Sequence, residues 1–178
     1  MKVLGIVGSP RKGSNTDLLV SALLYGAGAS NNQIEKLNLY ETEILPCIDC
    51  RACKKEDNKC LLSDGMQTIY QKIEDTDTIV FGSPLYWYGP SAKMKLLIDR
   101  LRPYIASKKL NGKKAVLIIP SEEGPDACNL TVEMFERSFK YLGIKLVGKI
   151  LPKAYEKAEV KGHFQVLDES YEMGKNLK

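Results

Sequence analysis

The sequence lacks the residues that several classes of enzyme and binding protein need. Its 178 residues include one histidine, His163, which stands in a polar C-terminal stretch where we expect it to be exposed. A Ser-His-Asp arrangement cannot be built around it, and we predict no catalytic side chain. Lysine and arginine number 26 against 22 acidic residues, and this excess of four positive charges is too small to indicate a nucleic-acid partner.

Long hydrophobic runs are lacking too. Residues 3–7 form an apolar stretch that ends at Gly8, Ser9 and Pro10, and this stretch is too short for the core of a signal peptide. No later stretch approaches the ~20 apolar residues of a membrane-spanning helix. We therefore expect a cytoplasmic protein without a membrane partner. No linker, repeat or low-complexity tract divides the chain, so residues 1–178 are expected to form a single domain.

What the chain does contain is an alternation of short apolar runs and amphipathic segments. The runs indicate strands at residues 3–7, 34–39, 78–81, 115–119 and 144–150. Apolar residues at helical spacing indicate helices from residue 15, over 66–73, 94–101 and 134–142, and over 168–176. The alternation predicts an α/β fold with a parallel sheet covered on both faces. Ligands bind such sheets beyond the carboxyl ends of the strands, so the loops after the first, third and fourth strands are candidate sites.

Local signals predict several of the helix ends. Gly26 and Gly28 should end the first helix. Asp64 and Gln67, three residues apart, resemble a capping box at the start of the next helix. The last helix should begin near Asp168, with acidic residues at its start and basic residues at its end.

The loop after the first strand, residues 8–16, is rich in groups that bind anions. It brings two cations, three hydroxyls, an amide and backbone N–H groups to a helix N-terminus, where the helix dipole also favours negative charge. A Walker loop would need Lys and then Ser or Thr after its second glycine, but Ser14 and Asn15 follow Gly13, and the dinucleotide pattern G-x-G-x-x-G is missing. The loop is therefore predicted to bind a phosphate without hydrolysing a nucleoside triphosphate. The alternative is a helix cap with solvated charges.

The loop after the third strand, residues 82–90, carries three consecutive aromatic residues. Tyr86, Trp87 and Tyr88 stand between Gly and Pro pairs and follow neither strand nor helix periodicity. A rigid loop of this kind can hold a planar ring by stacking, although loop packing or an oligomer contact would explain it as well. Together with the phosphate-binding loop at the same edge of the sheet, it predicts a mononucleotide with a large ring, and FMN fits best.

At these residues the sequence resembles the NADPH-dependent FMN reductase family of flavodoxin-like proteins. The resemblance is carried by residues 8–16, 83–90 and 93–100, and it extends to about the fifth strand. It implies a three-layer α/β/α sandwich around a five-stranded parallel sheet, with non-covalently bound FMN. It further implies that the phosphate is held by Ser9, Arg11, Ser14, Asn15 and Thr16, and that the isoalloxazine contacts Pro84, Leu85, Tyr86, Trp87 and Gly89.

Ser121, just after the fourth strand, would be a further FMN contact by the same resemblance. Its loop departs from the family pattern, because a Gly-rich loop is expected where residues 120–125 are Pro-Ser-Glu-Glu-Gly-Pro. Glu122 and Glu123 near a flavin would disfavour its anionic reduced form. Solvated loop charges are the simpler interpretation of both residues.

Four of the five cysteines fall within residues 47–60. Their spacing, Cys47-x2-Cys50-x2-Cys53-x6-Cys60, is close to that of bacterial ferredoxins, with a longer last gap. Structural zinc more often uses two separated C-x2-C pairs, so zinc comes second, and free thiols or a redox disulfide remain open. Basic residues among the cysteines would help to hold a negatively charged cluster and would raise its potential. Cys128 stands alone and is expected to be a buried packing residue.

The cysteine segment, residues 46–62, resembles the motif of the iron–sulfur flavoproteins, a branch of the same family. The resemblance implies an insertion after the second strand that holds a [4Fe–4S] cluster able to exchange electrons with FMN. The ligands would be Cys47, Cys50, Cys53 and Cys60.

The function that follows is that of an FMN-dependent oxidoreductase. NADH or NADPH would reduce the flavin, and the electrons would pass to a quinone, another flavin or, through the cluster, a protein acceptor. Two alternatives remain: an electron carrier without substrate turnover, and a cluster-free FMN reductase whose cysteines bind zinc or do redox work. The family resemblance also implies a homodimer or homotetramer.

Overall fold

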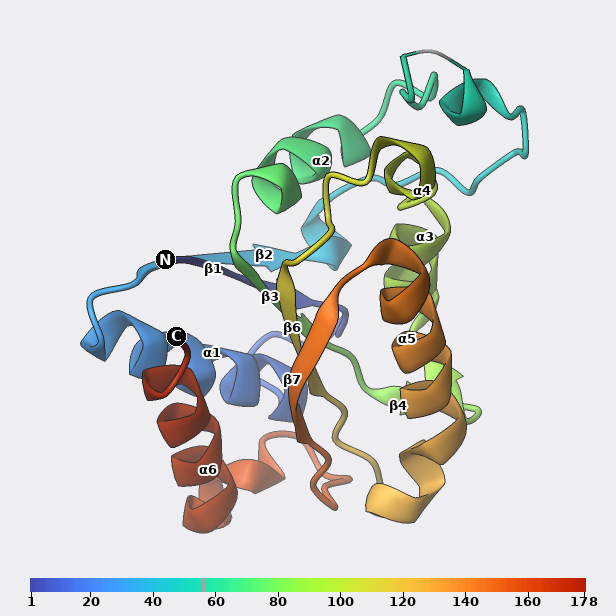
Figure 1. Ribbon diagram of the computed structural model, residues 1–178. Helices are drawn as coiled ribbons and strands as arrows, with labels where there is room; N and C mark the ends of the chain where they lie inside the picture. The colour runs from blue at the N-terminus through green and yellow to red at the C-terminus, as the bar shows by residue number, and fades with distance from the viewer. Residues whose placement is uncertain (56) are drawn as a thin grey trace.

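The sheet at the centre of the molecule is parallel, with five strands in the order β2-β1-β3-β6-β7 (Figure 1). The computed structural model describes residues 1–55 and 57–178. The strands of the central sheet are β1 (Lys2–Val7), β2 (Gln33–Asn38), β3 (Thr78–Gly82), β6 (Lys114–Ile118) and β7 (Lys145–Ile150). The expected strands and the flavodoxin-like fold are confirmed, since this is the flavodoxin-like strand order with its switch point between β1 and β3.

Helices cover both faces of the sheet and complete the three layers. On one face lie α1 (Asn15–Ala29) and α6 (Phe164–Lys175), and on the other lie α2 (Met66–Glu74), α3 (Ala92–Asp99), α4 (Pro103–Ser107) and α5 (Asn129–Leu142). Alternate side chains of one strand therefore enter different cores. Leu4 and Ile6 pack with the helices α2 to α5, while Val3 and Val7 pack with α1 and α6.

Short 3-10 turns connect these elements: η1 (Leu39–Glu41), η2 (Ala52–Lys54), η3 (Pro125–Cys128) and η4 (Glu159–Gly162). Cys128 at the end of η3 is fully buried, as expected of a packing residue. His163 is exposed, also as expected. Among the described residues, no helix has both the length and the apolar character needed to cross a membrane.

The end predicted for the first helix is wrong, because α1 continues through Gly26 and Gly28 to Ala29. The reason lies in tertiary packing. A Cβ atom on Gly26 would overlap the carbonyl group of Tyr171, and one on Gly174 would overlap the carbonyl group of Leu23. The two glycines thus allow the backbones of α1 and α6 to touch, and Gly26 serves that contact instead of a helix cap.

The helix α2 begins at Met66 as predicted, but the capping box before it is not formed, and the predicted start of the last helix is wrong. Gly65 is the N-cap residue of α2, and the Gln67 side chain donates to the carbonyl oxygen of Leu62 (2.8 Å) instead of closing a capping box. The carboxylate of Asp64 accepts from the N–H of Met66 (3.1 Å) but mainly serves an ion pair described below. The helix α6 begins at Phe164, so Asp168 lies inside it.

The aromatic loop is more regular than its sequence suggests. β4 (Leu85–Tyr86) and β5 (Gly89–Pro90) form an antiparallel hairpin, and Trp87 and Tyr88 between them have φ of 50° and 59°. Two successive positive φ values match the tight turn whose twist suits a hairpin. Asn and Gly usually occupy such positions, so bulky aromatic residues there are unusual and indicate that the turn carries a function.

Candidate functional site

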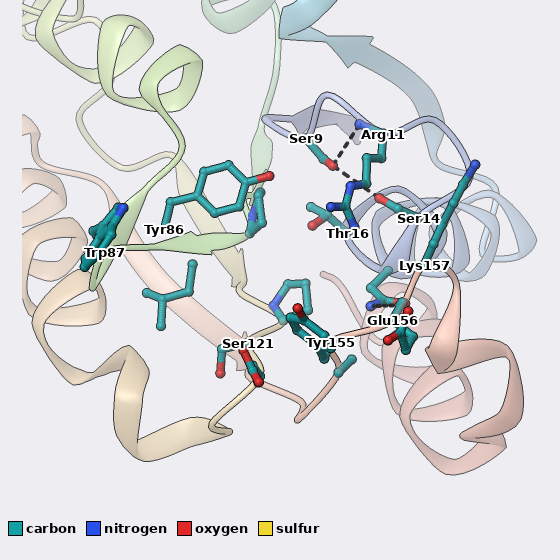
Figure 2. Close-up of a pocket in the computed structure, with 16 residues that line it drawn as sticks. Ser9, Arg11, Ser14, Thr16, Tyr86, Trp87, Ser121, Tyr155, Glu156 and Lys157 are labelled. Carbon is teal, nitrogen blue, oxygen red and sulfur yellow. Dashed lines mark hydrogen bonds between the residues drawn. The ribbon is translucent and has the colours of Figure 1, made fainter.

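A pocket of about 430 Å³ opens at the carboxyl edge of the sheet, where the loops after β1, β3, β6 and β7 meet (Figure 2). This volume lies within the usual range of cofactor sites. The structure brings ten of the predicted FMN contacts together around it: Ser9, Arg11, Ser14, Asn15, Thr16, Pro84, Leu85, Tyr86, Trp87 and Ser121. Gly89, the remaining predicted contact, lies in β5 and pairs with Tyr86 in the hairpin.

The polar end of the pocket is built by the loop between β1 and α1. Ser9 and Ser14 are buried, and their hydroxyl oxygens lie 3.2 Å apart. The Ser9 oxygen also accepts a hydrogen bond from the N–H of Arg11 (3.3 Å), which curls the loop toward the first turn of α1. The first N–H groups of a helix have no intrahelical acceptor, and here they stand beside two hydroxyls and the Arg11 cation. This set of donors fits a phosphate group.

Lys12 does not belong to this set of phosphate donors, although the sequence includes it with Arg11 as one of the two cations of the loop. Its ammonium group forms an ion pair with Glu41 in η1. That contact raises the pKa of Lys12, first through the hydrogen bond to Glu41 and then through its charge. The structure therefore leaves Arg11 as the cation that this loop contributes to the pocket.

The Asn15 side chain lines the pocket and also bonds to the loop after β7. Its Nδ2 donates to the carbonyl oxygen of Glu156 (2.9 Å), and its Oδ1 accepts from the N–H of Val160 (3.2 Å). The amide therefore ties α1 to the loop after β7. The Nδ2 group keeps a second N–H, and the backbone N–H of Asn15 lies in the first turn of α1, so both groups can meet a phosphate.

The loop after β7 is the part of the site that the sequence interpretation missed. Residues 154–157 line the pocket, and Figure 2 shows Lys157 and Arg11 on one side of it, with Tyr86 and Trp87 on the other. The loop is held by Glu159, whose carboxylate accepts the N–H groups of Tyr155 (2.7 Å) and Glu156 (2.8 Å). These two hydrogen bonds lower the pKa of Glu159. The position of this loop in the sequence could have identified it as part of the site, since a loop after a parallel strand emerges at the same edge of the sheet as the other loops.

Buried serine side chains lock the aromatic loop against the phosphate-binding loop. Ser91 at the N-terminus of α3 donates to the carbonyl oxygen of Gly8 (2.5 Å), and its own N–H donates to the Ser83 hydroxyl (2.9 Å). Thr131 of α5 donates to the carbonyl oxygen of Tyr88 (2.6 Å) and holds the hairpin from its other side. The polar and aromatic ends of the pocket are thus fixed relative to each other.

Ser121 lies at the base of the pocket, but its hydroxyl is engaged locally. It donates to the carbonyl oxygen of Gly124 (2.7 Å) and accepts the N–H of the same residue (3.0 Å). Glu122 lines the pocket, and both Glu122 and Glu123 are exposed. Their exposure agrees with the interpretation of these carboxylates as solvated charges.

The cysteine segment follows β2 and lies against α4, where Figure 1 shows it as the teal loop beside that helix. Cys47 and Cys50 are exposed, while Cys53 and Cys60 are half-buried, and all are free thiols. Burial raises the pKa of Cys53, and so do the neighbouring Cys60 and Cys47, against the lowering effect of Arg102. In the described ranges 1–55 and 57–178, no three Cys, His, Asp or Glu side chains converge as metal ligands do.

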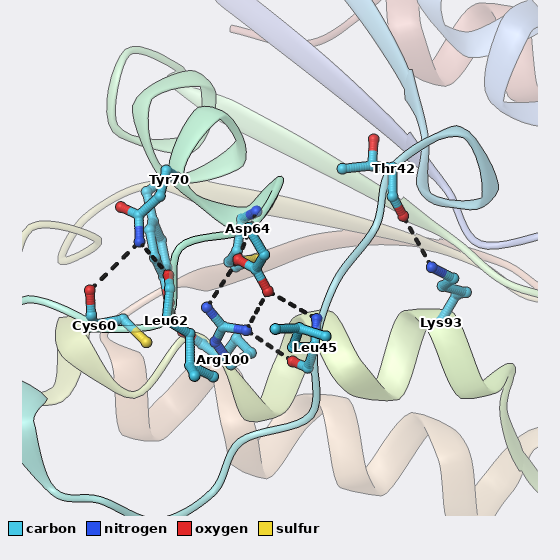
Figure 3. A network of polar contacts seen from close by, with 10 residues as sticks. Thr42, Leu45, Cys60, Leu62, Asp64, Tyr70, Lys93 and Arg100 are labelled. Atoms are coloured by element: carbon cyan, nitrogen blue, oxygen red, sulfur yellow. Dashed lines mark hydrogen bonds and ion pairs between the residues drawn. The ribbon is translucent and has the colours of Figure 1, made fainter.

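The segment is anchored at both of its ends by a buried ion pair between Asp64 and Arg100 (Figure 3). Arg100 Nη1 donates to Asp64 Oδ2 (2.7 Å) and to the carbonyl oxygen of Leu45 (2.7 Å), while the Leu45 N–H donates to Asp64 (2.7 Å). Burial by itself raises the pKa of Asp64. The hydrogen bonds from Arg100, Leu45 and Met66 outweigh it, so that this pKa lies below its usual value.

Comparison with known proteins decides the family. The sequence model of the NADPH-dependent FMN reductase family matches residues 1–152. The chain belongs to this family. The reductase is accordingly an FMN-dependent NAD(P)H oxidoreductase, in agreement with the phosphate-binding and aromatic loops that meet at its pocket.

Relatives of the reductase include proteins named for iron and sulfur. An iron–sulfur flavoprotein of Methanocaldococcus jannaschii is 36% identical over 157 residues, which cover 87% of this chain and 80% of that protein. An iron–sulfur flavoprotein of Methanosarcina thermophila is 36% identical over 100 residues, and the match spans 52% of its length. A Bacillus subtilis protein described as an NAD(P)H-dependent FMN-containing oxidoreductase is 26% identical over 94% of this chain and 93% of that protein.

Solved structures share the fold of the reductase. The Trp repressor binding protein from Bacillus subtilis superposes with a TM-score of 0.74 at 20% identity, over 97% of this chain and 99% of that chain. An NAD(P)H:quinone oxidoreductase from Methanothermobacter marburgensis superposes with a TM-score of 0.72 at 18% identity, over 100% and 99% of the two chains. At these identities the likeness establishes a common flavodoxin-like architecture.

Proposed function

We propose that the pocket at the carboxyl edge of the sheet is the FMN site, and that NAD(P)H and the electron acceptor use its open side. The observation that carries the proposal is the convergence of an anion-binding helix N-terminus and an aromatic hairpin on a single pocket. The paired buried hydroxyls of Ser9 and Ser14 fit a phosphate. The hairpin residues Leu85 to Trp87 fit a flat ring. FMN, when bound, supplies the hydride-accepting and electron-releasing chemistry.

The side chains of this protein bind and orient FMN, which carries the redox chemistry. For this reason the site needs no acid–base pair of side chains. The Ser9 and Ser14 hydroxyls, Arg11 and the first N–H groups of α1 hold the phosphate. The bonds among Ser83, Ser91 and Gly8 keep the ring and phosphate sites at a constant separation. The exposed side of the hairpin leaves room for a second planar ring.

We further propose that the four clustered cysteines hold a [4Fe–4S] cluster, so that the reductase belongs to the iron–sulfur flavoprotein branch. Two observations support this: the cysteine spacing and the names of the relatives. Two buried guanidinium nitrogens beside the segment have no acceptor among the described residues, and they also fit an anionic cluster. Because the thiols do not converge in the conformation described, binding requires the segment to close around the cluster.

The remaining parts of the proposal concern the assembly and its surroundings. We propose a homodimer or homotetramer that passes electrons to a quinone, a flavin or a protein acceptor. All five cysteines are free of disulfides, and this suits the reducing cytoplasm.

The decisive experiment is anaerobic purification followed by a visible spectrum, assays of iron and acid-labile sulfide, and steady-state oxidation of NADH and NADPH with a quinone acceptor. The proposal expects bound FMN, about four iron and four sulfide per chain, and turnover with at least one nicotinamide. Flavin without iron and sulfide would leave a cluster-free reductase. Flavin and cluster without turnover on any acceptor would favour an electron carrier.

A further inference from the structure

Two arginines that follow α3 reach into the cysteine segment from outside it. Arg100 contacts residues on both sides of the segment, Leu45 before the first cysteine and Asp64 after the last, and Figure 3 shows Cys60 beside it. Arg102 lies two residues further on, and its Nη1 is 3.2 Å from Oδ1 of Asp49, which stands between Cys47 and Cys50. The segment is therefore attached to the fold at three points by two guanidinium groups.

Each arginine also lies beside one of the half-buried cysteines. The positive charge of Arg102 acts on the Cys53 thiol, and Arg100 and Cys60 influence each other in the same way. Guanidinium groups are positively charged throughout the physiological pH range.

In the described residues, Arg100 and Arg102 each have one side-chain hydrogen-bond donor without an acceptor. Within the part of the chain that the structure describes, the Nε atoms of Arg100 and Arg102 are buried and have no hydrogen-bond acceptor. A buried donor without an acceptor costs about 1–3 kcal/mol, so native proteins rarely leave one unpaired without a reason. Cysteine sulfur is the acceptor that the adjacent segment offers to these donors.

We propose that Arg100 and Arg102 are positioning residues of the iron–sulfur site: their Nε–H groups donate to cysteine sulfurs at Cys60 and Cys53, and their charges raise the reduction potential of the cluster. This inference rests on the proposed function, because the cluster is part of it. Hydrogen bonds and positive charge at the cysteine sulfurs favour the reduced, more negative cluster, and a higher potential follows. Arg100 has the additional role of holding Leu45 and Asp64 together.

The test compares Arg102→Met and Arg102→Lys with the wild-type reductase after anaerobic reconstitution with iron and sulfide. Arg102 is chosen because it is partly exposed and its loss should leave the fold intact. Iron and sulfide content is measured first, and the midpoint potential of the cluster is then determined by a spectroscopic redox titration. Arg102→Met should retain the cluster with a lower potential, and Arg102→Lys should shift in the same direction by less.

Arg137→Met is the matched control, because Arg137 forms an exposed ion pair with Glu133 on α5, a helix that lies apart from the cysteine segment in Figure 1. Its potential should equal that of the wild type. A loaded Arg102→Met variant whose potential is also unchanged would overturn the inference while the proposed function stands. A wild-type protein that takes up no cluster would overturn both.

The holding role of Arg100 is tested on the metal-free protein. Trypsin can cleave after the basic residues between positions 51 and 59, and Arg100→Lys retains the charge but cannot bridge Asp64 and Leu45 in the same planar geometry. Cleavage there should become several-fold faster than in the wild type and in Arg137→Met, while circular dichroism shows an intact fold. Equal cleavage rates would show that Arg100 does not hold the segment.

Discussion

Asp64 and Arg100, considered as single residues, form an ion pair whose side chains are 3% and 1% exposed. The acceptors on Asp64 are filled by Arg100, Leu45 and Met66. Removing one partner of such a pair leaves a buried charge without compensation, and this costs more than an exposed pair contributes. The stability of the whole fold therefore depends on the carboxylate of Asp64.

Asp64→Asn should lower the free energy of unfolding by about 3–5 kcal/mol at pH 7, as measured by urea denaturation. The exposed pair of Lys95 and Asp99 provides the control, since Asp99→Asn should cost no more than ~1 kcal/mol.

The same pair predicts a pH dependence. The pKa of Asp64 is lower in the folded protein than in the unfolded chain. Its stabilisation is therefore present above the unfolded pKa of ~3.9 and is lost as the pH falls through the folded value. The difference in stability between wild type and Asp64→Asn should shrink below about pH 4. A difference that stays constant from neutral to strongly acidic pH would contradict this account.

Arg11 and Lys12 are adjacent cations with different contacts. Arg11 lines the pocket, whereas Lys12 is paired with Glu41. Arg11→Met should weaken FMN binding about tenfold, because an exposed charge-assisted contact to a phosphate contributes roughly 1.4 kcal/mol. Fluorescence titration of apoprotein with FMN measures this, and Lys12→Met should bind as the wild type does. Equal losses in the two variants would indicate a diffuse charge effect instead of a contact.

At the scale of elements, α1 and α6 cross where Gly26 and Gly174 bring their backbones together. No side chain fits between the two helices at this point. The contact also positions the loop after β7, because Ser170 of α6 donates to the carbonyl oxygen of Leu19 in α1 (2.9 Å). The packing of these two helices therefore reaches the pocket through the segment between β7 and α6.

Gly174→Ala should lower the free energy of unfolding by about 1–3 kcal/mol, because the new methyl group forces the helices apart and outweighs the better helix propensity of alanine. Gly28→Ala in α1 is the control, since its Cβ would lie 3.3 Å from the flexible end of Ile34. That variant should equal the wild type or gain up to ~1 kcal/mol. Thermal unfolding followed by circular dichroism compares them, and a Gly174→Ala variant as stable as Gly28→Ala would show that the helices can separate freely.

At the scale of the whole molecule, the helix α3 connects the pocket with the cysteine segment. Ser91 at its N-terminus is bonded to Gly8 of the phosphate-binding loop, and Arg100 after its last residue holds Asp64. Eight helical residues span about 12 Å. The two proposed redox sites of one chain therefore lie at opposite ends of this helix.

Binding of FMN to the folded state should stabilise the entire chain. At a concentration of FMN one hundred times its dissociation constant, the free energy of unfolding should rise by about 2.7 kcal/mol. Riboflavin, which lacks the phosphate, should stabilise clearly less at the same concentration. Thermal melts in the presence of each ligand measure the difference. Equal stabilisation by riboflavin would show that the loop of residues 8–16 does not bind the phosphate.

The sequence by itself determined the fold and most of the candidate pocket. Apolar periodicity and turn residues are local signals, and they located the strands. Because parallel strands present all their carboxyl ends at one edge of the sheet, the loops of residues 8–16 and 82–90 necessarily lie at the same edge. The family membership that the comparisons establish was accessible from the same two loops.

Only the tertiary structure decided how distant residues are paired. Asn15 holds the loop after β7, Lys12 pairs with Glu41, and Arg100 joins the two ends of the cysteine segment. Gly26, which locally resembles a helix end, permits a contact between helices instead. The physical reason is the same in each case: a polar group takes the acceptor that packing brings within reach, and packing is set by elements far away in the chain.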